Sequence, residues 1–434
     1  MAILQRVQWT LFQLGLVKTW TQVLFLALLL LVALWGFLRQ SGMDAEAKSS
    51  SEIVFLPFLN DKTGPAPDWN TLYEPQALVA QAPVGNGVGW GVKTQRKTPS
   101  EKASESGETL FLQTYQLLNS GNHAQALEVA QTMVERFPNF QLGQLMYADL
   151  MAGFSGGMPE REALLQQPEV RRRLSQLKAE ALQRTRHQDK TYFVGKYPAP
   201  LRYLSHSVSK VVVVDAQKSR LYVLSRPTDA LGESKLQVVF DAYVSIGNNG
   251  MGKWREGDGK TPAGVYFVQK HLTDPMLPDL YGSGALTLDY PSPIDKELKR
   301  TGSGIWLHGS PSEQYARPPT ATDGCVVLAN DDMTRLVQLG LKADTPVIIA
   351  EQLTWHDAPK ASPLKAPPKS WPEPEDMRKT PGDWQLISAF EWTDKQNNVA
   401  VLSHELQAPG RAPKRLHSYW VMDGKQWKEV GRPG

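Results

Sequence analysis

The sequence predicts a multidomain α+β protein. It reads as an N-terminal transmembrane helix, a small α-helical region, a mainly-β domain of sandwich or barrel type, and a short C-terminal antiparallel β segment. Three observations predict this order: an uncharged apolar run near the N-terminus, a stretch with apolar residues at helical spacing, and a longer stretch of short β-rich runs separated by Gly, Pro, Asn and Asp. The 434 residues leave room for two or three domains, and 41% hydrophobic with 21% charged residues are globular values.

Residues 19–38 contain no charged side chain and are bounded by Lys18 and Arg39. About twenty apolar residues span a bilayer. Small residues suited to signal cleavage come several positions late, so we expect an uncleaved anchor after a tail at 1–18. Basic residues are nearly even on both sides, and charge alone does not settle the orientation. Residues 39–108 are rich in Ser, Pro, Gly, Lys and Glu, which predicts a flexible linker.

Residues 109–192 predict a helical region, because apolar residues recur at helical spacing with a Ser-Gly-Asn break. The pattern of Gly121, Ala126 and Pro138 resembles a single tetratricopeptide repeat. One such unit cannot bury its own apolar face, so ordinary helix packing remains the alternative.

Residues 195–351 predict the mainly-β domain, with runs such as KVVVVDA, SRLYVLS and PVIIAEQ. One helix is expected within it, DDMTRLVQLG, capped by Asn330 or Asp331 and ended by Gly340.

After this domain, residues 352–376 predict a Pro-rich linker and residues 377–434 a β-meander that resembles part of a nuclear-transport-factor-like module. Asp423-Gly424 predicts a hairpin turn there. The tryptophans of the meander fit either a sugar-stacking surface or the core of a small sheet; they are Trp384, Trp392, Trp420 and Trp427.

Charge and composition exclude several classes of function. A formal charge of +3 without a basic patch interleaved with aromatics predicts no nucleic-acid partner. A single cysteine excludes internal disulfides and multi-cysteine zinc sites, and the eight histidines lack ligand spacing. We expect neither a metal nor another cofactor.

The single cysteine, Cys325, follows Gly324 and precedes a run of valines. A lone cysteine often packs as a small hydrophobe. His308, however, ends the strand GIWLH, where alternation places it on one face with Trp306. An imidazole that accepts the thiol proton activates a cysteine nucleophile, and the Gly324 and Cys325 amides suit an oxyanion.

Four motifs in order resemble the catalytic domain of the bacterial L,D-transpeptidases: GDGKTPAGVY (257–266), YGSGALTLDYPSPID (281–295), GSGIWLHG (302–309) and ATDGCVVLAND (321–331). In that family a cysteine attacks the L,D-peptide bond ahead of the terminal D-alanine of a peptidoglycan tetrapeptide stem. The acyl-thioester then passes to an amine of a second stem. The resemblance implies that Cys325 is the nucleophile, His308 the base, Gly309 the carbonyl that orients the imidazole, and Gly324 an oxyanion donor.

The cysteine motif departs from the family pattern at two positions. Thr322 matches, but Asp323 stands where the family has His, and Val327 where it has Arg. An Asp beside the sulfur opposes thiolate formation unless it faces away or pairs with a cation. Arg317, in the loop before the cysteine, is the candidate replacement for the missing Arg.

We also expect Thr322, Asp323, Trp306 and Tyr290 to contact the substrate.

The resemblance implies a single-pass protein of the bacterial inner membrane whose catalytic domain lies in the periplasm and cross-links or remodels peptidoglycan. Two alternatives stay open: hydrolysis through the same acyl-enzyme, as an L,D-carboxypeptidase or endopeptidase, and a catalytically silent wall-binding scaffold. The expected partners are peptidoglycan stems, the inner membrane, and cell-wall proteins that meet the helical and C-terminal regions.

Overall fold

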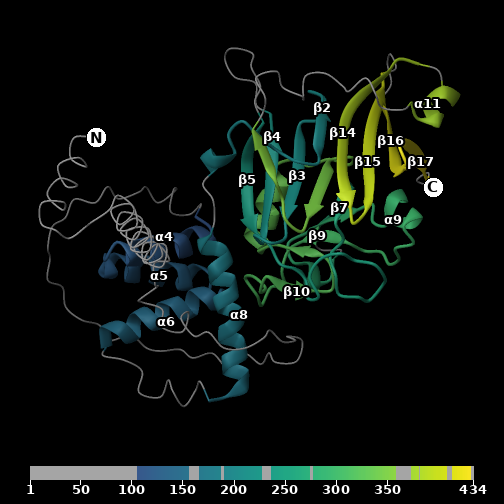
Figure 1. Cartoon of the computed structure of the whole chain (residues 1–434). Helices are drawn as coiled ribbons and strands as arrows, with labels where there is room; N and C mark the ends of the chain where they lie inside the picture. The colour runs from purple at the N-terminus through teal and green to yellow at the C-terminus, as the bar shows by residue number, and fades with distance from the viewer. Residues whose placement is uncertain are drawn as a thin grey trace, which may run out of the picture. The chain divides into compact units, whose positions relative to one another are not determined.

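The computed structural model of the chain describes residues 105–155, 166–186, 190–226, 236–273, 277–357, 373–380, 382–407 and 413–431 (Figure 1). Within these ranges no helix has the length and apolarity to cross a membrane. The expected tail, the expected anchor and nearly all of the linker before the helical region lie outside the described residues.

The described residues form an α+β fold, as predicted. The helices are α4 (Gly107–Asn119), α5 (His123–Arg136), α6 (Gln141–Ser155), α8 (Pro168–Thr185), α9 (Pro293–Glu297), α10 (Asn330–Gln338) and α11 (Glu375–Lys379), with short 3₁₀ turns η2 (Lys190–Phe193) and η3 (Asp279–Tyr281). The strands are β1 (Lys196–Pro198), β2 (Leu201–Leu204), β3 (Lys210–Asp215), β4 (Arg220–Ser225), β5 (Gln237–Tyr243), β6 (Ile246–Gly247), β7 (Gly264–Leu272), β8 (Ala285–Leu288), β9 (Trp306–His308), β10 (Thr320–Thr322), β11 (Val326–Val327), β12 (Pro346–Ala350), β13 (Trp355–Asp357), β14 (Trp384–Asp394), β15 (Asn397–Leu406), β16 (Lys414–Asp423) and β17 (Gln426–Val430).

The middle of the chain forms a curled, mixed half-barrel sheet with strand order β11-β9-β8-β7-β12-β3-β4-β5. Most neighbours are antiparallel, but β12 pairs with β3 and β11 with β9 in parallel. The four valines of β3 are all buried because both faces of the sheet are covered: Val212 and Val214 pack with α10, and Val211 and Val213 pack with β2 and β14. Burial on both faces explains why this strand is continuously apolar instead of alternating.

The C-terminal strands form a separate antiparallel sheet of order β17-β16-β15-β14-β2 (Figure 1). Its fifth strand, β2, comes from the start of the segment predicted as the catalytic domain. Strand β13 lies inside the stretch predicted as a linker and pairs with β1. The two sheets have no strand in common but share hydrophobic cores, and Phe267 of β7 packs with Val399, Val401 and Tyr419 of the C-terminal sheet.

Two helices of the central domain differ in detail from the prediction. The residue that caps α10 is Ala329, and neither Asn330 nor Asp331 serves as the N-cap. The short helix α9 was not predicted; a capping box between Ser292 and Asp295 starts it, with Pro293 in its first turn. Five residues are too few to produce a helical periodicity that sequence alone reveals.

Candidate active site

The parallel pair β9 and β11 brings Cys325 and His308 together. Val326 pairs with Leu307 and Val327 with His308. Continuing this register by one residue sets Cys325 beside Trp306. Side chains at paired positions of a ladder share a face and alternate along each strand, so Cys325, Trp306 and His308 all lie on one face. The predicted nucleophile and base are therefore neighbours on one sheet face.

His308 is held as a neutral base with a defined tautomer. Its Nδ1 lies 2.6 Å from the Gly309 carbonyl oxygen, and a carbonyl can only accept, so Nδ1 carries the proton. This leaves Nε2 as the proton acceptor. The side chain is 4% exposed, and burial lowers the pKa of the imidazole to about 4, with the charge of Arg317 adding to the effect.

Cys325 rests as a thiol. Burial raises its pKa and the charge of Asp323 adds to this, while the Trp306 amide, Arg317 and Lys253 oppose it. Its Sγ donates to the Gly304 carbonyl oxygen at 3.3 Å. A neutral thiol beside a neutral imidazole is a nucleophile that must be deprotonated during the reaction, not a preformed ion pair.

The turn before the cysteine is fixed by Thr322. Its Oγ1 accepts from the Gly324 amide at 3.1 Å and donates to the Cys325 carbonyl oxygen at 2.7 Å. Gly324 has φ +132°, and a Cβ there would lie 2.6 Å from the Lys260 carbonyl oxygen. Only glycine fits this position. Because its amide already donates to Thr322, the Cys325 amide is the better placed of the two expected oxyanion donors.

The charges of Arg317 and Asp323 both act on Cys325. Asp323 is exposed, whereas Arg317 is half-buried. Burial lowers the pKa of Arg317, while the charges of Asp323 and of a Cys325 thiolate raise it. Its Nη1 lies 3.4 Å from the Ala321 carbonyl oxygen, and across the described part of the chain no carboxylate forms an ion pair with it. A half-buried guanidinium without an ion-pair partner suits a ligand carboxylate.

Two aromatic side chains, Trp306 and Tyr281, lie beside Cys325 and His308. The ring of Trp306 lies 4.7 Å from that of Tyr281, which meets the His308 ring edge-on at 5.1 Å. Tyr281 was missed from sequence because η3, which ends with it, is distant in the chain and carries no catalytic pattern. Tyr290, by contrast, is a core residue: it is 5% exposed, and its hydroxyl donates to the Thr301 carbonyl oxygen at 3.1 Å.

Comparison with known proteins agrees with this geometry. Residues 209–349 match the family model described as the L,D-transpeptidase catalytic domain, YkuD. The chain therefore carries an L,D-transpeptidase catalytic domain. No curated protein matches the sequence.

Solved structures similar to the chain include three with low overall superposition. One is Bd1075 from Bdellovibrio bacteriovorus, with 24% identity, TM-score 0.38, and coverage of 54% of this chain and 96% of the other. Another is the helical cell shape determining protein Pgp2 from Campylobacter jejuni, with 18% identity, TM-score 0.36, and coverage of 56% and 95%. The third is an L,D-transpeptidase from Mycobacterium smegmatis, with 16% identity, TM-score 0.20, and coverage of 33% and 58%.

The helical region packs against the loop that carries Arg317 in the L,D-transpeptidase domain and forms hydrogen bonds with it. Tyr315 of this loop lies 4.4 Å from Phe140 between ring centroids, and its amide donates to the Asn139 carbonyl oxygen at 3.2 Å. The Asn139 side-chain amide donates to the Ser312 carbonyl oxygen at 3.0 Å. The loop is thus bonded to the helices through both backbone and side chain.

A buried ion network joins the same parts. Glu108 of α4 accepts from Arg220 of β4 at 2.7 Å and pairs with Arg184 of α8 at 3.1 Å. The Arg184 guanidinium lies 4.1 Å from the ring centroid of Tyr243, whose hydroxyl donates to the Arg317 carbonyl oxygen at 2.9 Å. The helical region and Arg317 are therefore connected by direct contacts.

Proposed function

We propose that the chain is a membrane-anchored periplasmic L,D-transpeptidase that transfers a peptidoglycan tetrapeptide stem from Cys325 to an amine. The neutral, tautomer-fixed His308 beside the Cys325 thiol on one sheet face is the observation that supports this most strongly. The apolar run at residues 19–38 supports an anchor, and a wall substrate requires the domain to lie outside the cytoplasm.

Acylation begins when the thiol turns from the Gly304 carbonyl and gives its proton to Nε2 of His308. The sulfur attacks the carbonyl carbon of the L,D-peptide bond, and the negative charge on the carbonyl oxygen is met by the Cys325 amide. As the C–N bond breaks, the imidazolium returns the proton to the leaving D-alanine nitrogen. A thioester and a neutral imidazole remain.

In deacylation the acceptor amine is the nucleophile and the Cys325 thiolate is the leaving group. An acceptor amine loses a proton to His308 as its nitrogen attacks the thioester, and the thiolate leaves and recovers that proton. The Gly309 carbonyl stabilises the imidazolium in both half-reactions because it holds Nδ1–H. Arg317 binds a substrate carboxylate in place of the arginine that Val327 replaces, and Asp323 is exposed to solvent.

Acylation by a carbapenem, followed by intact-mass measurement, tests the nucleophile. We expect a single adduct on the wild type, none on Cys325→Ala, and acylation at least 100-fold slower on His308→Ala. His404→Ala is the matched control, because His404 is also buried with a pKa lowered to about 4 but belongs to the C-terminal sheet. An adduct on Cys325→Ala would contradict the proposal.

The two alternatives give different results with the same reagents. A hydrolase forms the adduct and releases D-alanine from a tetrapeptide but yields no cross-linked product. A silent scaffold forms no adduct as wild type and gains one in Asp323→His, because the charge of Asp323 raises the pKa of Cys325.

A further inference from the structure

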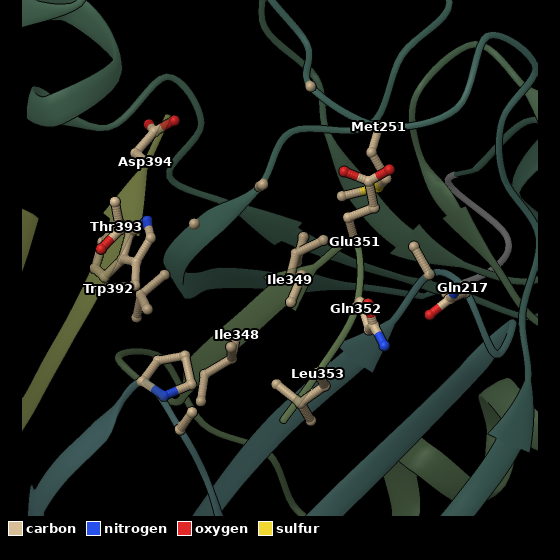
Figure 2. Close-up of a pocket in the computed structure, with 18 of the residues that line it drawn as sticks. Gln217, Met251, Ile348, Ile349, Glu351, Gln352, Leu353, Trp392, Thr393 and Asp394 are labelled. Carbon is tan, nitrogen blue, oxygen red and sulfur yellow. The ribbon is translucent and has the colours of Figure 1, made fainter. Parts of the chain in front are cut away.

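A cavity of about 710 Å³ lies away from Cys325 and His308, neither of which contributes to its wall. Figure 2 shows Ile348, Ile349 and Leu353 along β12 and the segment after it, Met251 from the loop after β6, and Trp392 with Thr393 and Asp394 at the end of β14. The wall thus combines the catalytic sheet with the C-terminal sheet.

The loop from Gly247 to Thr261 connects the cavity to the catalytic cysteine. Met251 and Gly252 line the cavity, and the Gly252 amide donates to the Thr261 carbonyl oxygen at 2.9 Å. The Thr261 hydroxyl in turn donates to the Gly324 carbonyl oxygen at 2.9 Å, one residue before Cys325. One loop therefore forms a wall of the cavity and supports the cysteine turn.

A second segment sets an upper limit on the separation of a cavity residue from the contact of the Cys325 thiol. Arg300 lines the cavity, and Gly304, four residues later, accepts from the Cys325 thiol at 3.3 Å. Four residues span at most about 14 Å. Three residues lie on the sugar side of the bond that is cleaved in a tetrapeptide stem, and they extend over roughly 10 Å before the lactyl link is added. The extended length of such a stem is therefore comparable with the longest possible separation of Arg300 and Gly304.

The chemistry of the wall fits an uncharged polar ligand with an apolar face. The charges of its ionisable side chains cancel, since Arg300 and Lys395 are balanced by Glu351 and Asp394. The wall carries the indole of Trp392, with its flat apolar faces, on one side and the amides of Gln217 and Gln352 on the other (Figure 2).

Two buried N–H groups of this wall have no hydrogen-bond partner among the described residues, Arg300 Nε and Trp392 Nε1. Arg300 is 7% exposed, and its other nitrogens are taken by Asp295 at 3.0 Å and Asp394 at 2.5 Å. Unpaired buried donors favour a ligand rich in acceptor oxygens, which a small side-chain shift brings within reach.

We propose that this cavity is a carbohydrate subsite that holds an N-acetylated amino sugar of the glycan strand while the peptide stem occupies the cysteine site. The inference rests on the proposed function for its substrate. The sugar stacks on Trp392, and its hydroxyl and acetamido oxygens accept from the donors of the wall.

The test compares a free tetrapeptide with the same tetrapeptide carried on its disaccharide, using D-alanine release by the full-length chain. We expect wild type to prefer the glycan-linked stem by about tenfold in KM, and Trp392→Ala to reduce this preference to about one. Trp384→Ala is the matched control, since Trp384 lies on the same strand outside the cavity and its Nε1 already donates to the Thr380 carbonyl oxygen at 2.9 Å.

A second variant and a second measurement distinguish a loss of sugar binding from a loss of the fold or of the reaction. Gln217→Trp places a larger side chain at an exposed position of the cavity wall without removing a core contact, and we expect it to lose the preference as Trp392→Ala does. Calorimetric titration with diacetylchitobiose, which has no peptide, should show binding to wild type and none to either variant. Binding without D-alanine release would overturn the proposed reaction alone. Equal KM values for both substrates on wild type, or an unchanged preference in Gln217→Trp, would overturn the subsite.

Discussion

The proposed role of His308 as a neutral base predicts how the reaction rate depends on pH. Its pKa is lowered from 6.5 to about 4 by burial, so the base form persists in acid where an exposed imidazole would be protonated. We expect the rate constant for carbapenem acylation to stay constant from pH 8 to pH 5 and to halve near pH 4. Stopped-flow kinetics measure this, with circular dichroism as the check on folding. A half-point near 6.5 would contradict the assignment.

Arg317 should act on substrate binding. Because it has no ion-pair partner among the described residues, its removal leaves a substrate carboxylate without a cation. We expect Arg317→Ala to raise KM for a tetrapeptide stem by about 10-fold to 100-fold, as the loss of a charged hydrogen bond predicts, with a smaller effect on kcat.

Arg202→Ala is the control for Arg317, because Arg202 is an exposed arginine of β2. An unchanged KM in Arg317→Ala would contradict the claim that Arg317 binds the substrate.

At the residue scale, the sequence predicted the two residues that the fold brings together but not all of their surroundings. Cys325 and His308 came from local motifs that the parallel pair β9 and β11 then joined. Tyr281 was missed and Tyr290 was expected at the substrate, because the sequence does not reveal which aromatic side chains turn toward the core. The hydrogen bond from the Gly324 amide to Thr322 likewise depends on a turn geometry that spacing alone does not give.

At the scale of elements, the helical region stabilises the loop that carries Arg317. Glu108 is buried between Arg184 and Arg220, and although burial favours its protonated form, the two arginines lower its pKa. We expect Glu108→Gln to destabilise the fold by about 3 kcal/mol, since it breaks a buried ion network. It should also raise KM through the displaced loop. Urea unfolding and steady-state kinetics measure both effects.

Glu169→Gln is the control for this network, because Glu169 pairs with Arg172 at 3.9 Å on the surface of α8. An exposed pair of this kind contributes less than about 1 kcal/mol. Equal stability of wild type and Glu108→Gln would contradict the claim that the ion network of the helical region stabilises the loop that carries Arg317.

The elements themselves divide into those that local patterns predict and those that they do not. The four valines of β3 predicted a buried strand, and the periodicity of residues 109–192 predicted helices, because both signals are local. The pairing of β2 with β14 joins residues nearly two hundred positions apart and leaves no local signal. For this reason the sequence predicts the C-terminal meander as a module of its own.

At the scale of the whole molecule, shared hydrophobic cores hold the C-terminal sheet against the catalytic sheet, and residues of both sheets line the cavity. This arrangement explains how a meander of four strands is stabilised, since β2 completes its sheet and Phe267 enters its core. The central claim at this scale is that the chain uses Cys325 to transfer a peptide stem that is carried on a disaccharide.

The measurement that tests the central claim most directly is product analysis of purified disaccharide tetrapeptides incubated with the full-length chain and with Cys325→Ala. The account predicts an acyl-enzyme on wild type whose mass corresponds to the stem without its terminal D-alanine. It also predicts a cross-linked dimer formed as D-alanine is released, and neither product with Cys325→Ala. Release of D-alanine with a tripeptide stem and no cross-linked dimer would show that the chain hydrolyses the acyl-enzyme and does not transfer it. No release and no acyl-enzyme would contradict the account.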